Sequence, residues 1–254
     1  MTRVLPRTNF HSSKLIRCLA DLDLVHTADP GSSYAETLGL WIHFADAITL
    51  SAVHNDSIAI PTNGSSKARD AAHAAVDAEC KRIQRMLANT VRESCLPDSG
   101  KTHITLPPPI SEPVPDLSKA YAPYRRFYEA HQRDMESSIQ PLRARVRETV
   151  AKTSPRLKKL ADLDATFEKI LRDRENKLLS KVPLLLKKRF AQLFQEYQQT
   201  SIDARQAGNP AGRMPAGAWL ARFCDDMRTL LLAEVELRMQ PTVGLIEAIK
   251  QDTQ

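Results

Sequence analysis

Few residues in this chain combine a reactive side chain with the spacing that a catalytic site needs. Gly100-Lys101-Thr102 has the ending of a phosphate-binding P-loop, but Cys95 occupies the position where that motif needs its first glycine. A proline-rich stretch also follows where the motif needs a helix. No G-x-S-x-G nucleophile elbow occurs either. We therefore predict no catalytic residue and no nucleotide site. An enzyme whose site is built from scattered polar residues remains a hypothesis beside the two non-enzymatic ones given below.

The histidines and cysteines do not have the spacing of a metal site. His43 with Asp46, and His131 with Asp134, would each share one helix face, but zinc takes three or four protein ligands. No E-x-x-H pair of the di-iron type occurs. No C-x-x-C pair occurs among the cysteines, which are Cys18, Cys80, Cys95 and Cys224. We predict no metal, no cofactor, and free thiols in a reducing compartment.

Basic residues gather in one short stretch of the chain, residues 141–160. The formal net charge is +6, and residues 116–254 hold 25 Lys/Arg against 18 Asp/Glu, whereas residues 1–115 hold 11 against 12. Within residues 141–160 the only acidic residue is Glu148. The candidate partner contacts in this stretch are Arg143, Arg145, Arg147, Arg156, Lys158 and Lys159.

This basic stretch spans the expected turn between two long helices, so we expect its charge to gather at one end of a bundle. Such an end could bind phosphates, anionic lipid headgroups or an acidic protein. The alternative is a solubilising turn, because Lys and Arg also favour the C-terminal end of a helix.

Three helices are predicted before residue 97. Apolar spacing indicates helices at about 12–26, 33–55 and 67–95, with Ser33 and Glu36 at capping-box spacing before the second. The first two helices should form a hairpin across Asp29-Pro30-Gly31. We expect one apolar face on the second helix, made by Leu38, Trp41, Ile42, Ala45, Ile48 and Ala52.

Residues 97–115 (PDSGKTHITLPPPISEPVP) are rich in proline and cannot continue a helix. We therefore predict an N-terminal helical region at 1–96, a proline-rich linker at 97–115 and a long-helix bundle at 116–254.

Three very long helices are predicted after the linker, at about 116–152, 154–199 and 215–251. Ser154 as cap and Pro155 at the first helical position make the clearest start signal. The apolar spacing is coiled-coil-like, so these helices should form an elongated antiparallel three-helix bundle in an all-α fold. Each helix contains one proline about 25–28 residues from its start, Pro141, Pro183 or Pro241, which should kink or split it.

The N-terminus, MTRVLPRTNF, lacks the continuous apolar stretch of a secretory signal. No window approaches the roughly 18 apolar residues of a membrane-spanning helix. We expect a cytoplasmic protein, and docking on a membrane protein stays open.

The whole chain resembles a family known mainly from betaproteobacteria, whose shared domain has no assigned function. The stretches that carry the resemblance include RTNFHSSKLIRCLADLDL, ETLGLWIHFADAITLSAVHN, HQRDMESSIQPLRARVRE and LLAEVELRMQPTVGLIEAI. The family provides no catalytic residues to transfer. The genes that encode its members lie beside genes for stator-like membrane proteins and for peptidoglycan-binding outer-membrane-type proteins. The resemblance therefore implies a cytoplasmic accessory of an envelope complex.

Long apolar stripes without site chemistry favour a non-enzymatic interaction or scaffold protein. Its partner would be another protein. Candidate partners are a membrane-anchored protein, a coiled-coil protein or a second copy of this chain. The alternative is a nucleic-acid-associated protein that binds through the basic end at 141–160. That alternative lacks a helix-turn-helix pattern.

Overall fold

The structure is a computed structural model that describes residues 13–25, 41–55, 66–96, 102–110, 116–206, 215 and 217–252. Across these residues the chain forms α-helices and no β-strand, which confirms the all-α fold class. The predicted start of the second helix and residues 97–101 and 111–115 of the linker lie outside the described residues.

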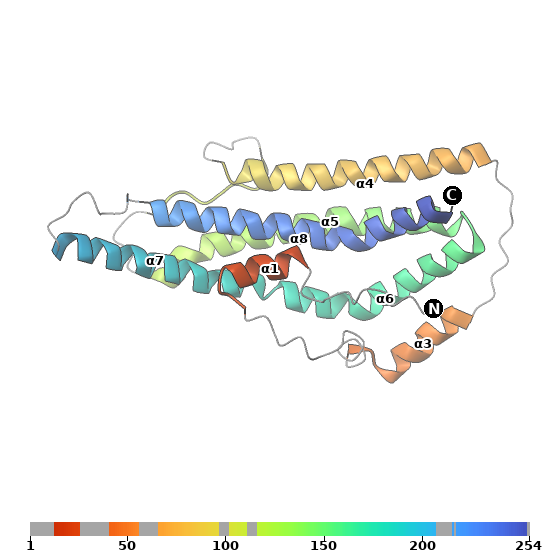
Figure 1. The fold of residues 1–254 in the computed structure, drawn as a ribbon, viewed down its shortest axis with the longest axis horizontal. Helices are drawn as coiled ribbons and strands as arrows, with labels where there is room; N and C mark the ends of the chain where they lie inside the picture. Colours follow the sequence, from red (N-terminus) through yellow and green to blue (C-terminus); the bar gives the residue numbers. More distant parts are fainter. Residues whose placement is uncertain are drawn as a thin grey trace, which may run out of the picture.

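Four long helical runs lie side by side and form the body of the molecule (Figure 1). They are α4 (Ser66–Ser94), α5 (Leu117–Ala151), the consecutive pair α6 (Pro155–Leu179) and α7 (Val182–Gln206), and α8 (Ala218–Asp252). Each run is antiparallel to the one before it, as the colour order shows. The result is an elongated four-helix bundle in which α5 and α8 are the central pair, since both contact every other run.

The fourth member of this bundle, α4, was not expected there. Its second half packs on α5 and α8 through Cys80, Ile83, Leu87 and Val91, which are all buried. Its alanine-rich first half has mostly exposed side chains. The predicted boundary at 97–115 therefore does not separate an N-terminal region from the bundle, because residues before it complete the bundle core.

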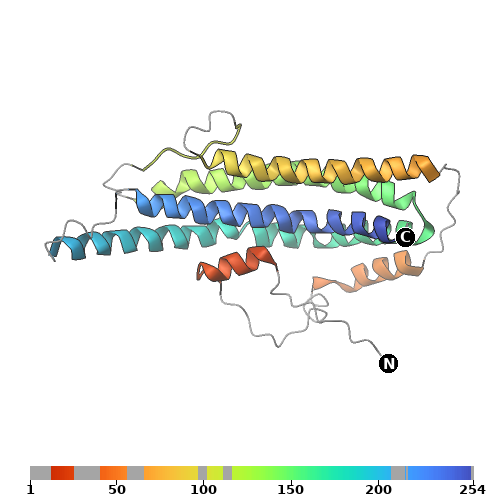
Figure 2. The same ribbon diagram turned by 45° about the horizontal axis from the view of Figure 1, so that its top comes forward.

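The two described N-terminal helices pack on the bundle and do not pair mainly with each other, as the predicted hairpin would require. Helix α1 (Lys14–Asp21) buries Leu15 and Leu19 against α8, and the Lys14 ammonium lies 2.6 Å from the Glu236 carboxylate. Helix α3 (Phe44–Asn55) lies along α6 instead. Both helices lie outside the four-helix body (Figure 2).

The predicted cap at Ser154 is confirmed, and the structure adds a second cap at Asp116, where the sequence indicated only the approximate start of a helix. The Asp116 carboxylate accepts hydrogen bonds from the backbone N–H groups of Ser118 and Lys119, at 2.9 and 3.2 Å. The Ser154 hydroxyl accepts one from Leu157 N at 3.3 Å, and Pro155 is the first residue of α6. These caps satisfy N–H groups that have no partner within the helix.

The three prolines behave differently. Pro141 lies inside a continuous α5 and Pro241 inside a continuous α8, whereas the predicted 154–199 helix is split between Leu179 and Val182, next to Pro183. Proline has no N–H for the carbonyl four residues before it. At the split, the side-chain amide of Gln132 donates to the Leu179 carbonyl at 3.1 Å and replaces that missing donor.

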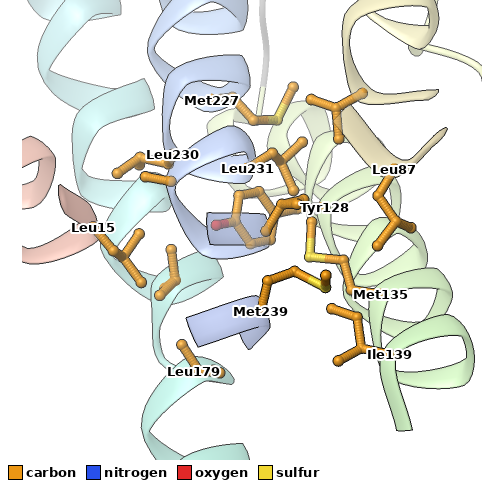
Figure 3. Close-up of a cluster of buried hydrophobic side chains, with 14 of the residues drawn as sticks. Leu15, Leu87, Tyr128, Met135, Ile139, Leu179, Met227, Leu230, Leu231 and Met239 are labelled. Carbon is orange, nitrogen blue, oxygen red and sulfur yellow. The ribbon is translucent and has the colours of Figure 1, made fainter. Parts of the chain in front are cut away.

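The core runs along the whole bundle. In its middle, Tyr128 and Met135 of α5 pack with Leu231 and Met239 of α8 and with Leu87 of α4 (Figure 3). Toward the beginning of α8 the core becomes aromatic. Neighbouring rings from α5, α7 and α8 have their centroids 5.0 to 6.5 Å apart. These rings belong to Tyr121, Tyr124, Phe190, Phe194, Tyr197, Trp219 and Phe223. Burial of such large rings stabilises the packing of these long helices.

Candidate functional site

Two of the six predicted contact residues, both of them arginines, form ion pairs inside the bundle. Arg143 Nε donates to Asp164 at 3.0 Å, and Arg147 donates to both Asp164 and Glu168, so α5 is tied to α6. All four side chains are largely buried. Burial opposes the ionisation of Glu168, but hydrogen bonds from Arg172 and Arg147 outweigh it and lower the pKa of this carboxyl.

Arg145 is mostly exposed but also has an acidic neighbour within the chain. Its guanidinium lies 2.9 Å from the Glu79 carboxylate and so connects α5 to α4. Hydrogen bonds from Arg82, and then from Arg145, lower the pKa of Glu79 to about 2. The three arginines of α5 in the predicted basic cluster are therefore compensated by carboxylates from two neighbouring helices.

The remaining three predicted contacts lie in the first two turns of α6. Arg156 is exposed, Lys158 and Lys159 are half-buried, and within the described part of the chain none of them forms an ion pair. The first turn of α6 contains no acidic residue. A helix N-terminus carries partial positive charge, which disfavours nearby cations. We call Arg156, Lys158 and Lys159 the basic turn, and it is the uncompensated part of the predicted cluster.

Helix α3 presents an apolar side to solvent that the sequence reading missed. It is 12 residues long, and none of its residues is buried. Phe44 is 82% exposed and Ile48 is 55% exposed, although both are large apolar side chains. Their spacing of four places them on one face of the helix, with Ala52 one further turn along. We predicted Ile48 and Ala52 in the packed face, and the structure places both in the exposed class.

Helix α6, which supports α3, is also incompletely covered. Its buried residues are few, and Leu160 and Leu178 stay exposed. A further apolar set on α6 is only half-buried, and it consists of Leu163, Phe167, Ile170 and Leu171. We call the exposed side of α3 together with Leu160 and Leu178 the α3–α6 surface. On both helices the apolar residues are not confined to one face, and this pattern is the sequence signal that could have indicated the surface.

A polar cluster inside the bundle centres on Glu234, which is 0% exposed. Its carboxylate accepts hydrogen bonds from Tyr128 Oη at 2.9 Å, Gln132 Nε2 at 3.0 Å and Arg238 Nε at 2.9 Å. Gln132 also binds the Leu179 carbonyl at the split between α6 and α7. This cluster therefore joins α5 and α8 to each other and to the split between α6 and α7.

A hollow of about 990 Å³ lies beside the C-terminal end of α4 and the first turns of α8. Most of its lining is apolar, including Pro107 and Leu220, and the thiols of Cys95 and Cys224 also line it. Burial raises the pKa of Cys95 to about 11 and that of Cys224 to about 12. Both thiols therefore stay protonated near neutral pH and are poor nucleophiles.

The described residues contain no group of three or more His, Cys, Asp or Glu side chains close enough to hold a metal ion. None of their helices combines the length and the apolar character needed to cross a membrane.

The fold and its surfaces define an all-α helical-bundle protein. The chain belongs to the family described as "Protein of unknown function (DUF3348)", whose model matches residues 1–251. This match confirms the resemblance to a family without assigned function over most of the chain. No curated protein and no solved structure matches it.

Proposed function

We propose that this chain is a non-enzymatic helical interaction protein whose partner covers the α3–α6 surface. One observation carries the proposal: α3 is a separate helix on the side of the bundle, and its two large apolar residues, Phe44 and Ile48, face solvent. Single exposed apolar residues are common. A row of them on a helix with no buried residue is typical of an interaction site.

The stability of α3 supports the same conclusion. An isolated helix of about 12 residues is marginal in water, and most helices in proteins are stabilised by burying an apolar face. Helix α3 gains little from α6, because none of its side chains is buried there. Covering Phe44 and Ile48 would contribute roughly 2 kcal/mol for each side chain.

We place the protein in the cytoplasm, as an accessory of a larger and cell-envelope-associated complex, which is the role that the family resemblance implies. The alternative is nucleic-acid binding at the basic end. It depends on the basic turn, because Arg143, Arg145 and Arg147 already face carboxylates.

The test compares three tagged proteins at native expression level in the native cell. They are the wild type, the double variant Phe44→Ser with Ile48→Ser, and the control Leu184→Ser with Ile202→Ser. The control removes two exposed apolar residues of α7 instead. Detergent extracts, with and without nuclease, are captured on the tag and analysed by mass spectrometry. We expect a stoichiometric protein that the wild type and the control retain and the α3 variant loses.

Equal recovery of every captured protein by all three chains would refute the proposal. Nucleic acid retained without nuclease, and no protein lost by the α3 variant, would support the alternative. All three proteins should have the same melting temperature within about 2 °C, because exposed substitutions change stability by only about 0.5 kcal/mol.

A further inference from the structure

The α3–α6 surface and the basic turn adjoin each other, although they come from distant parts of the chain. Near the beginning of α3, the His43 ring lies 3.3 Å from the Arg174 guanidinium of α6. Figure 1 shows α3 running antiparallel to α6 from that point. Twelve residues span about 18 Å on either helix, so the end of α3 lies near residue 162, about one turn from Lys158 and Lys159.

The charges along this flank are predominantly positive and uncompensated. In the described chain, no ion pair is formed by Arg156, Lys158, Lys159, Lys169 or Lys177 of α6. The acidic residues of α6 that also lack an ion pair are fewer, namely Asp162, Asp173 and Glu175. Most other arginines of the bundle that contact carboxylates do so at 2.5 to 3.0 Å. The basic turn is therefore a local excess of charge that another molecule can neutralise.

We propose that the partner contributes an acidic amphipathic helix, which packs its apolar stripe on Phe44 and Ile48 and its carboxylates beside the basic turn. This inference rests on the proposed function and adds the chemistry of the partner to it. The spacing of Phe44, Ile48 and Ala52 makes a ridge that fits the groove of another helix. The basic turn adds electrostatic complementarity, which selects among apolar partners.

Two other occupants fit the surface less well. A lipid surface is bound by a single amphipathic helix that carries Lys and Arg on its own polar face. Here the apolar side chains lie on α3 (FADAITLSAVHN), which has neither residue type, and the basic turn lies on α6. Nucleic acid offers no apolar stripe for Phe44 and Ile48, and so would leave both of these exposed side chains uncovered. Both occupants are nevertheless distinguishable outcomes of the experiment.

The experiment adds two charge-reversal variants to the capture from native cells. One is Lys158→Glu with Lys159→Glu, in the basic turn. The matched control is Lys187→Glu with Lys188→Glu, which reverses two adjacent exposed lysines on α7. Bound protein is quantified at 150 and 500 mM salt. We expect the basic-turn variant to lose the Phe44-dependent partner at least about fivefold, the control to bind like the wild type, and high salt to weaken wild-type binding.

The possible results separate the two proposals. If the partner depends on Phe44 and Ile48 but binds the basic-turn variant normally, the proposed function stands and the acidic-helix inference is overturned. If the partner is independent of α3 as well, both are overturned. A captured partner without an acidic amphipathic segment, a second copy of this chain, or a nuclease-sensitive or detergent-sensitive lipid association would also overturn the inference.

Discussion

At the scale of single residues, Glu234 is the charge whose removal should matter most. Its carboxylate is fully buried and shares hydrogen bonds with Tyr128, Gln132 and Arg238. We predict that Glu234→Gln lowers the free energy of unfolding by about 3 kcal/mol, because it leaves the largely buried Arg238 without a countercharge. Urea denaturation followed by circular dichroism measures this loss.

Glu236 is the matched control for this prediction. It lies two residues away on the same helix, and its ion pair with Lys14 is about half exposed on both sides. Glu236→Gln should cost less than about 1 kcal/mol. Equal losses for the two variants would contradict a structural role for the buried cluster.

His131 should make stability depend on pH. It is buried, its ring contacts the Ser94 hydroxyl at 2.9 Å, and burial lowers its pKa to about 4, with a smaller effect from His103. In the unfolded chain its pKa is about 6.5, so between pH 6.5 and 4 the unfolded state binds more protons. The stabilisation is complete above pH 6.5 and decreases as the pH falls to 4, by roughly 3 kcal/mol in total.

Urea denaturation at several pH values between 7.5 and 4 measures this effect for the wild type and His131→Asn. Because the variant lacks the titrating ring, the difference between the two curves isolates the contribution of His131 from that of the carboxylates. Parallel curves across this range would mean that the ring does not titrate as its burial requires.

Some residue roles could be predicted from the sequence and others could not, depending on the range of the interaction. The cap at Ser154 depends on a neighbour three residues away, so the sequence indicates it directly. The pairing of Arg143 with Asp164 joins two helices across the bundle, and no local pattern indicates it. The predicted basic cluster therefore contains six residues, of which only the three of the basic turn lack a carboxylate partner among the described residues.

At the scale of helices, the three internal prolines should differ in their effect on stability. Pro141 and Pro241 are exposed inside continuous helices, where each removes one backbone hydrogen bond. We predict that Pro141→Ala and Pro241→Ala each raise the free energy of unfolding by about 1 to 2 kcal/mol, after the loss of chain rigidity is subtracted.

Pro183→Ala is the contrasting variant and should not stabilise the protein. Pro183 is buried, and the Leu179 carbonyl that would gain a donor already accepts one from Gln132. Its free energy of unfolding, measured by urea denaturation, should stay within about 0.5 kcal/mol of the wild type or fall. If Pro183→Ala raised the free energy of unfolding as much as Pro141→Ala, the hydrogen bond from Gln132 would not compensate for the missing backbone donor at the split.

The same contrast explains what helix-level prediction missed. All three prolines lie deep inside a predicted helix, and the split occurs where α5 supplies the replacement donor, which only the packed structure contains. Likewise, α4 is rich in alanine, and its few large residues indicate no specific neighbour until α5 and α8 are in place.

At the scale of the whole molecule, the arrangement predicts an elongated particle. Helices α6 and α7 contain 25 residues each and run nearly end to end, which corresponds to a length of about 75 Å. A rod of this length has a radius of gyration of roughly 23 Å, whereas a compact domain of this size has about 18 Å. Small-angle X-ray scattering of the isolated protein should give the larger value.

The mass in solution tests whether the α3–α6 surface needs a different protein. If an acidic partner covers this surface, the isolated chain lacks its complement and should be a monomer of 28.4 kDa in size-exclusion chromatography with light scattering. Twice this mass, reduced to the monomer by Phe44→Ser with Ile48→Ser, would mean that a second copy covers α3. A dimer that persists in the variant Phe44→Ser with Ile48→Ser would mean that the chain self-associates through another surface. The proposed partner would then still bind at α3. The monomer result, by contrast, leaves Phe44 and Ile48 as exposed as the structure shows them and therefore available to another protein.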